Sequence, residues 1–418
     1  MSWTYARLDE VAKSVGGATP STAVPEYWNG EIQWATPADL SELHSRYISD
    51  TPRKITTAGL QSCAADILPA NSVLISSRAP IGYVAINLVP MATNQGFKSI
   101  VPDASKLCSG FAYWWLKANE GYLQRLGNGA TFKEISKAVV SGIQIPVPPL
   151  DEQQRIAATL DQADDLRRKR RLALGKLNQL PQAIFHELFG DPIRNHRGWP
   201  LRSIADLVSS FATGKNLVAE DALNSRALYR VLRISAIGAD GYNAARTKAL
   251  PHGYVPPAEH RVRPGDLLIT RANTRELVGR VALVEHTPDN VYLPDKVLRF
   301  VFKATSDVEV RYVQAVFEHR SMRELLDSLA TGTSGSMKNL SQGKLLGIKI
   351  AVPPMERQRS FSDAYEELSR LTQCQRGYLL KLDRLIESLQ HRAFNGTMTI
   401  LSADPAIASL QPDNLAPV

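Results

Sequence analysis

Two long stretches of the chain place apolar residues at helical spacing. The first runs from Pro149 to about Phe189 and the second from Pro354 to about residue 396, with apolar side chains three, four or seven positions apart. Heptad-like spacing over ~35–40 residues predicts two long helices that pack on each other, each reaching ~50–60 Å at 1.5 Å per residue. The residues expected to form this helix–helix contact are Ile156, Leu160, Leu174, Leu177, Ile184, Phe361, Leu368, Leu379, Leu382 and Leu389.

The edges of these helical stretches carry further signals. Each is preceded by a short alternating apolar segment, GIQIPVPP or GIKIAVPP, that stops at two prolines. This pattern predicts a short strand followed by a linker. Pro181 lies inside the first stretch and lacks a backbone donor, so we expect it to kink or interrupt that helix.

The two stretches belong to an internal repeat. Residues 126–190 align without gaps with residues 331–395, with 18 identities in 65 positions. Ordinary composition would give roughly four or five. Upstream the match is looser: SVLISSRAPIGYVAI from Ser72 is similar to DLLITRANTRELVGRVALV from Asp266. The repeat predicts a variable domain (1–150), a helix (151–190), a second variable domain (191–353), a second helix (354–396) and a tail (397–418) whose small and polar residues predict disorder.

Composition narrows the class of protein. A chain of 418 residues exceeds what one core usually supports, and 44% hydrophobic with 22% charged residues is typical of a soluble protein. The first residues lack an apolar signal region, and no apolar run approaches the ~18 residues of a membrane span. Three cysteines lie far apart, which fits neither a disulfide framework nor a metal site. We therefore expect a cytoplasmic protein.

The charge is unevenly distributed. Of the net +8, residues 1–150 carry +1, whereas residues 191–353 carry 23 Lys/Arg against 16 Asp/Glu. Both helical stretches are nearly neutral, and the basic run at residues 167–171 has no counterpart in the second copy. We interpret that run as a solvated or partner-facing surface, with nucleic-acid contact as the alternative. The excess in the second variable domain predicts a larger phosphate contribution there, should the partner be nucleic acid.

Motifs for catalysis are missing from the sequence. The three Pro-Pro pairs lack the preceding Asn or Asp and the following aromatic residue that an adenine methyltransferase needs. Gly214-Lys215 and Gly343-Lys344 lack the spacing of a P-loop, and Pro294-Asp295-Lys296 lacks the second acidic element of a metal nuclease. The eight histidines form no metal pair. We expect no catalytic residue and no metal site.

The repeat architecture resembles the specificity subunit of type I restriction-modification systems. The segments that carry the resemblance are IPVPPLDEQQRI and LPQAIFHELFGDP in the first copy and IAVPPMERQRSF and LIESLQHRAFNG in the second. The second helix departs from the pattern, because it begins Glu356-Arg357-Gln358-Arg359. The resemblance implies an α+β fold, with two pseudo-repeated target-recognition domains separated by two long antiparallel coiled-coil helices.

The resemblance also implies partners. Each domain would recognise one part of a split, asymmetric site in double-stranded DNA, and the helices would fix the gap between the parts. The helices would also dock two methyltransferase (modification) subunits, with restriction (nuclease/translocase) subunits as further candidates and no membrane involved. No cofactor is expected on this chain, whereas S-adenosylmethionine is expected on the partner methyltransferase subunit.

Candidate DNA contacts are polar residues in loops of the variable domains. Arg and Lys suit guanine, Asn and Gln suit adenine, and Ser and Thr suit either. Two interpretations stay open beside DNA contact: the glycine-rich loops could be plain turns, and an arginine could bond its own domain's carboxylates. The candidates are Ser76, Ser77, Arg78, Asn94, Gln95, Asn128, Thr131, Lys133, Thr270, Arg271, Asn273, Arg275, Thr333, Ser336, Lys338 and Asn339.

A second class of function competes with DNA recognition. Two ligand-binding modules on a coiled-coil spacer would form a non-catalytic scaffold with the same helical pattern. That hypothesis predicts no salt-dependent binding to duplex DNA.

Overall fold

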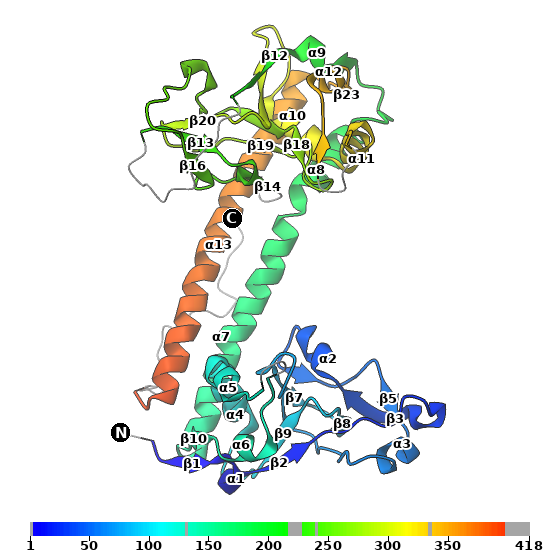
Figure 1. Cartoon of the computed structure of the whole chain (residues 1–418), viewed down its shortest axis with the longest axis vertical. Coiled ribbons are helices and arrows are strands. Elements are labelled where there is room, and N and C mark those ends of the chain that lie inside the picture. Colours follow the sequence, from blue (N-terminus) through cyan, green and yellow to red (C-terminus); the bar gives the residue numbers. More distant parts are fainter. Residues whose placement is uncertain (1–2, 130–132, 216–227, 239–240, 333–336, 398–418) are drawn as a thin grey trace. The chain divides into compact units, whose positions relative to one another are not determined.

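The computed structural model describes residues 3–129, 133–215, 228–238, 241–332 and 337–397 (Figure 1). The chain divides into two compact units. Unit 1 comprises Met1–Leu172 with Gly377–Val418, and unit 2 comprises Ala173–Arg376. Of the tail 397–418 that was expected to be disordered, residues 398–418 lie outside the described residues. Because each long helix crosses the boundary, both units contain one part of each helix.

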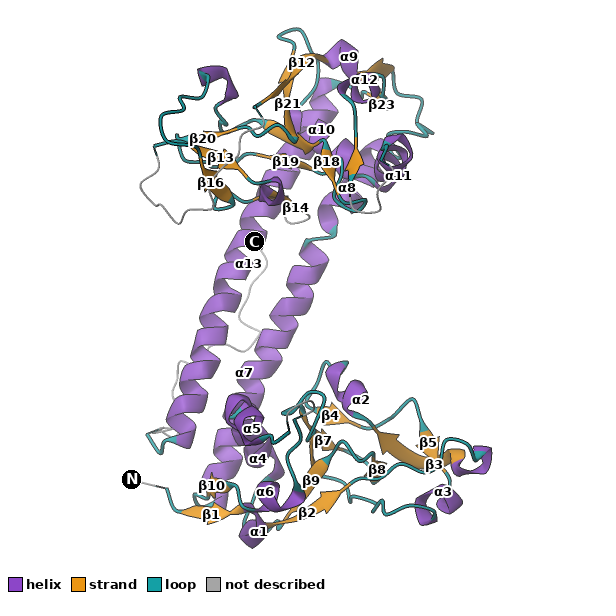
Figure 2. Cartoon of the chain, in the orientation of Figure 1, coloured by secondary structure: helices purple, strands orange, loops and turns teal. Residues whose placement is uncertain are grey.

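Unit 1 is built on two small sheets and a group of helices (Figure 2). One sheet has the strand order β2-β9-β6-β7-β4 and the other β5-β3-β8. The strands are β1 (Tyr5–Arg7), β2 (Ala12–Gly16), β3 (Trp28–Ala35), β4 (Tyr47–Ile48), β5 (Lys54–Ile55), β6 (Val73–Ile75), β7 (Val84–Asn87), β8 (Met91–Thr93), β9 (Lys98–Pro102) and β10 (Gln144–Pro146). The helices of the domain are α1 (Leu8–Val11), α2 (Pro37–Ser41), α3 (Thr57–Gln61), α4 (Ser109–Ala118), α5 (Glu120–Leu126) and α6 (Lys137–Ser141).

Unit 2 repeats this plan. Its sheets have the orders β12-β21-β17-β19 and β16-β13-β20, with the short pairs β14-β15 and β18-β22. The strands are β11 (Leu201–Ser203), β12 (Val208–Thr213), β13 (Arg230–Leu232), β14 (Ile237–Gly238), β15 (Gly241–Tyr242), β16 (Thr247–Ala249), β17 (Leu267–Thr270), β18 (Ala272–Asn273), β19 (Val281–Leu283), β20 (Val291–Tyr292), β21 (Val297–Phe302), β22 (Lys338–Asn339) and β23 (Lys349–Ala351). The helices are α9 (Ile204–Leu207), α10 (Val310–Glu318), α11 (Arg320–Leu329) and α12 (Gln342–Leu346).

The strands predicted before the two Pro-Pro linkers are confirmed as β10 and β23. Each pairs antiparallel with the first strand of its own domain, β10 with β1 and β23 with β11. The backbone N–H that follows β1 or β11 then donates to the same place in both domains, from Leu8 to Ile143 (2.9 Å) and from Ile204 to Ile348 (2.8 Å). The shared segment therefore closes each domain by returning to its first strand.

The long helices are α7 (Leu150–Leu177), α8 (Leu180–Phe189) and α13 (Met355–Phe394). The break after Leu177 lies just before Pro181, which confirms the expected interruption of the first helical stretch. The second stretch has no proline inside it and stays unbroken over 40 residues.

Within unit 1 the helices run antiparallel, as expected. Arg167 and Arg171 of α7 form ion pairs with Asp383 of α13, at 3.7 Å and 3.3 Å. Earlier in α7, Ile156 lies in the same core as Phe394, near the end of α13. Residue numbers thus rise along one helix as they fall along the other.

The residues predicted for helix packing differ in burial. Ile156, Leu160, Phe361 and Leu382 are buried, and they lie where a helix meets the core of its own domain or its partner helix. The others are half-buried: Leu174, Leu177, Ile184, Leu368, Leu379 and Leu389. Ile156 and Leu160 belong to the core of unit 1, and Phe361 belongs to the core of unit 2.

The core of unit 2 joins both helices to the domain through aromatic rings. The ring of Phe185 in α8 lies 5.6 Å from Tyr312 in α10 and 5.5 Å from Phe361 in α13, measured between centroids. The Tyr312 hydroxyl donates to the Ala351 carbonyl at 2.6 Å, and its burial raises the pKa of the phenol. Rings at this spacing pack edge-to-face or offset, which adds to the area that they bury.

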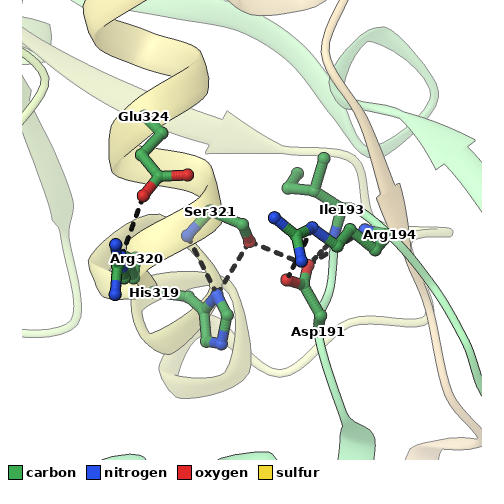
Figure 3. A network of polar contacts seen from close by, with 7 residues as sticks. All are labelled: Asp191, Ile193, Arg194, His319, Arg320, Ser321 and Glu324. Carbon is green, nitrogen blue, oxygen red and sulfur yellow. Dashed lines mark hydrogen bonds and ion pairs between the residues drawn. The ribbon is translucent and has the colours of Figure 1, made fainter.

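A polar network holds the segment after α8 against the α10–α11 corner (Figure 3). Asp191 accepts hydrogen bonds from the backbone N–H groups of Ile193 and Arg194, both at 2.9 Å, and from the Ser321 hydroxyl at 2.8 Å. His319 caps α11 and contacts Ser321 through Nδ1 at 2.8 Å. Although serine, histidine and aspartate meet here, the serine lies between the other two and donates to the carboxylate. That order is not the nucleophile–base–carboxylate order of an acyl-transfer triad.

Candidate nucleic-acid interface

In both domains a buried strand ends in a polar loop that one hydroxyl holds in place. After β6, the Ser76 hydroxyl donates to the Pro80 carbonyl at 2.8 Å and accepts from the Tyr83 N–H at 2.8 Å. After β17, the Thr270 hydroxyl donates to the Leu277 carbonyl at 2.7 Å and accepts from the Arg280 N–H at 3.1 Å. The two hydroxyls occupy equivalent positions.

The residues that follow these hydroxyls, Ser77 and Arg271, have equivalent backbone positions but different side chains. The Ser77 N–H donates to Gly96 (2.7 Å), and the Arg271 N–H donates to Lys296 (3.0 Å). The carbonyls of Ser77 and Arg271 then accept from Ile135 and Leu340, at 3.0 and 2.8 Å. One scaffold thus presents serine and glycine in unit 1 but arginine and lysine in unit 2.

These hydrogen bonds correct part of the candidate set. Ser76, Ser77 and Thr270 are buried, and their hydroxyls are bonded to backbone atoms of their own domain. We therefore remove these three from the candidates for base contact. The sequence pattern suggested exposure because small polar residues follow an apolar strand, but here they close the loop instead of facing solvent.

Two of the candidate arginines have acidic partners. Arg78 lies 3.6 Å from Glu134, which also pairs with Lys98 at 3.1 Å. Arg275 forms a two-point contact with Asp327, with N···O distances of 3.0 and 2.7 Å, and this hydrogen bonding raises the pKa of Arg275. Both arginines match the alternative in which an arginine bonds its own domain's carboxylates.

Arg271 differs from these two. It is half-buried, and it forms no ion pair with any residue that the structure describes. Its backbone lies between Lys296 and Leu340, which places the side chain among the polar loops of unit 2. Of the candidate arginines, Arg271 is the one left available for an external acceptor.

The remaining candidates lie in the same loops. Asn94 and Asn273 accept from nearby backbone N–H groups, those of Gly96 and Thr274, both at 2.9 Å. Gln95 is exposed and accepts from the Thr19 hydroxyl. Exposed residues also include Asn128, Lys133 and Asn339, whereas Lys338 is half-buried and donates to the Gly332 carbonyl. Thr131, Thr333 and Ser336 lie outside the described residues.

Backbone hydrogen bonds join the two ends of each glycine-rich loop. Asn128 and Glu134 exchange backbone hydrogen bonds of 3.1 and 3.0 Å, as Thr331 and Asn339 do at 2.9 and 2.7 Å. Glu134 and Asn339 also bridge to the strand-end segments at Arg78 and Ala272. In each unit the loop is therefore joined by a ladder to the segment that follows β6 or β17.

The sequence reasoning missed one more segment of each cluster. A Cβ at Gly17 would lie 2.0 Å from the Asn94 carbonyl oxygen, and one at Gly214 would lie 1.7 Å from that of Leu293. Only glycine permits such close backbone approach. Thr19 and Lys215 follow closely, so both belong to the candidate surface. The Gly-Lys pair was visible in the sequence, but only as a failed P-loop.

Known proteins that resemble this chain are of one kind. Residues 1–176 match the model of the type I restriction modification DNA specificity domain. The chain is 24% identical over 368 residues to the EcoKI specificity subunit of Escherichia coli K12, covering 83% of this chain and 78% of that one.

Over residues 1–176 the chain is similar to the type I restriction modification DNA specificity domain, and the relatives described here are specificity subunits of type I restriction enzymes.

Two further relatives come from an archaeon. The MjaIX specificity subunit of Methanocaldococcus jannaschii is 34% identical over 227 residues, but the match spans only 49% of this chain and 51% of that one. The MjaVIII subunit of the same organism is 19% identical over 418 residues, covering 95% and 93%. The chain thus spans about half the length of the first relative and nearly all of the second.

Two solved structures share the fold. The S subunit from M. genitalium has a TM-score of 0.56 at 15% identity, covering 94% of this chain and 96% of that chain. A chain solved in work on complex assembly and conformational transition of the type I R-M system has a TM-score of 0.60 at 17% identity, covering 95% and 98%. This chain therefore shares with both structures an α+β fold of two β-rich domains joined to long paired helices.

The described residues add two findings. No helix among them is long and apolar enough to cross a membrane. In that same part of the chain, no three His, Cys, Asp or Glu side chains gather where they could hold a metal ion.

Proposed function

We propose that this chain is the non-catalytic specificity subunit of a type I restriction-modification system and recognises a bipartite, asymmetric site in double-stranded DNA, with one domain on each half-site. The observation that supports this most directly is the duplicated loop cluster. The same backbone ladder carries Ser77 in one domain, where its buried hydroxyl donates to the Gly96 carbonyl, and Arg271 in the other, where it forms no ion pair with any residue that the structure describes. Because base contacts depend on side-chain donors and acceptors, unlike side chains on one scaffold suit unlike half-sites.

The helices would set the gap between the half-sites and dock methyltransferase subunits. Within unit 1, several apolar side chains of α7 and α13 are unusually exposed: Leu172 at 63%, Leu380 at 62%, Leu385 at 51% and Tyr378 at 48%. Exposed apolar residues on a helix pair favour a protein partner. S-adenosylmethionine and the methyl-transfer chemistry would belong to that partner, and restriction subunits would join the same complex.

The test is methylome sequencing of cells that express this chain with its methyltransferase subunit. We expect one motif made of two unlike parts separated by a fixed gap. Replacing residues 1–150 with those of another specificity subunit should change only one part of the motif. The same exchange at residues 191–353 serves as the matched experiment for the other part.

The competing scaffold hypothesis makes the opposite prediction. If the purified complex with its methyltransferase subunit bound no duplex DNA at low salt, and no motif were methylated, DNA recognition would be ruled out. A motif whose two parts both changed on exchanging one domain would instead contradict the assignment of one domain to each half-site.

A further inference from the structure

The start of each long helix carries one buried glutamine, and the two glutamines bond to three equivalent backbone groups. Gln153 in α7 and Gln358 in α13 are both 0% exposed, although each is the fourth residue of a helix. A glutamine amide offers one acceptor oxygen and two donor hydrogens, and burial is costly unless these are satisfied. Both side chains satisfy all three.

In unit 1 the Gln153 amide joins the helix to the loop before α4. Its Oε1 accepts from the Cys108 N–H at 2.8 Å, and its Nε2 donates to the carbonyls of Lys106 (2.8 Å) and Pro148 (2.9 Å). Cys108 is the N-cap residue of α4. One side chain therefore ties together α7, the Pro-Pro linker and the start of the domain's main helix.

In unit 2 Gln358 makes the same three bonds. Its Oε1 accepts from the Glu309 N–H at 2.9 Å, and its Nε2 donates to the carbonyls of Asp307 (3.2 Å) and Pro353 (2.7 Å). Glu309 is the N-cap residue of α10. All six partners are backbone atoms, so the domains can change their side chains without losing this attachment.

Farther along each helix, a second contact joins it to the domain. In α7, Asp161 accepts from the Trp114 indole at 2.8 Å and pairs with Arg46. In α13, the Tyr365 ring lies under the Arg311 guanidinium at 4.5 Å. These second contacts differ chemically, whereas the glutamine contact is the same. The glutamine is therefore the polar contact that holds the helix start to the domain in the same way in both units.

We propose that Gln153 and Gln358 are positioning residues that fix each recognition domain on its helix and so set the gap length that the subunit accepts. This inference rests on the proposed function, because the gap exists only if each domain recognises one half-site. Asparagine is too short to reach all three partners, a carboxylate cannot donate to two carbonyls, and methionine keeps a similar volume but offers no comparable amide.

The test is the gap distribution in methylomes of the Gln153→Met and Gln358→Met subunits, each expressed with its methyltransferase subunit. We expect the two parts of the motif to stay unchanged, while methylation at gaps one base pair longer or shorter rises roughly tenfold, the factor that a discrimination weaker by about 1.4 kcal/mol produces. Gln154→Met is the matched control, since Gln154 is the exposed neighbour on the same helix.

A purely structural role would look different. It predicts weaker methylation overall and a lower melting temperature, with the gap distribution of the wild type, and that result would overturn the proposal. If Gln153→Met does not accumulate, Gln358→Met and Gln153→Glu provide the same measurement. Absence of any two-part motif in the wild type would instead count against the proposed function, so the two failures are distinguishable.

Discussion

At the scale of single residues, a carboxylate partner within the protein decides whether a cationic side chain is available to an external acceptor. Arg275 and Arg271 lie on the same polar segment of unit 2. Arg275 donates two hydrogen bonds to the Asp327 carboxylate, whereas Arg271 has no acidic partner among the described residues. An arginine without a carboxylate can form two parallel hydrogen bonds with guanine O6 and N7.

We predict that Arg271→Ala relaxes the base preference at one position of one half-site. The expected decrease in discrimination is about 1–3 kcal/mol at that position, because a two-point contact with a base contributes this much. Methylome sequencing or competition binding with single-base variants of the site measures it.

Arg275→Ala is the control for this prediction, since its guanidinium already serves Asp327. It should leave the motif unchanged. Equal relaxation by both substitutions, or relaxation in the half-site assigned to the other domain, would contradict the role given to Arg271.

Phe185 illustrates a residue whose role is structural. Its ring is 2% exposed and packs against Phe189, Tyr312 and Phe361. Phe185→Ala should lower the free energy of unfolding by about 3–5 kcal/mol, because it leaves a cavity and also removes apolar burial. Chemical denaturation measures the change. Leu180→Ala on the same helix should cost far less, since Leu180 is 40% exposed; equal decreases would mean that α8 is not anchored through Phe185.

At the scale of elements, the paired helices are similar in sequence between the two copies of the repeat, whereas the domains that they carry differ. Their antiparallel pairing in unit 1 rests on ion pairs with Asp383 and on the apolar residues near the ends of α7 and α13. If they set the gap, their length must matter. A helix grows by 1.5 Å per residue, so one added heptad lengthens it by ~10.5 Å.

We predict that a heptad inserted after Leu172 in α7 and another after Arg376 in α13 lengthen the accepted gap. The increase should be at most about three base pairs, since successive base pairs are ~3.4 Å apart. Methylome sequencing gives the new gap directly. Insertion into α7 alone is the control and should abolish the motif or weaken it strongly, because the paired residues would no longer align. An unchanged gap after the double insertion would show that the helices do not set it.

At the scale of the whole molecule, charge distinguishes the two domains. Residues 191–353 carry most of the excess positive charge, and Lys215, Arg271 and Lys296 lie on adjacent segments of the unit 2 loop cluster. Phosphate binding releases counterions, so affinity falls with salt in proportion to the number of phosphates that the protein neutralises.

We predict that Lys215→Gln combined with Lys296→Gln makes DNA binding less dependent on salt without altering the motif. The slope of log affinity against log salt should become shallower by roughly 0.9 for each phosphate that the variant no longer neutralises. Titrations of the methyltransferase complex at several salt concentrations measure the slope. Arg202→Gln with Lys349→Gln, on β11 and β23, is the matched control; an equal effect there would mean that the charge acts through the whole domain and not through the loop cluster.

The sequence by itself determined the repeat, the two strands before the Pro-Pro linkers, the long helices and the break before Pro181. These follow from short-range rules: apolar spacing, the missing donor of proline, and identity at a constant offset. In the sequence, Gln153 and Gln358 form only one of the eighteen identical pairs of the repeat, and nothing there indicates that their side chains are buried.

Only the tertiary structure decided which polar side chains face outward. Ser77 and Arg271 follow similar apolar strands, yet one is buried and the other lacks an acidic partner among the described residues. Arg78 and Arg275 meet carboxylates that lie 56 and 52 positions away in the sequence. Local spacing in the sequence does not encode a partner that only folding brings near. That partner decides whether a polar loop residue is bonded inside its own domain or is available to an external ligand.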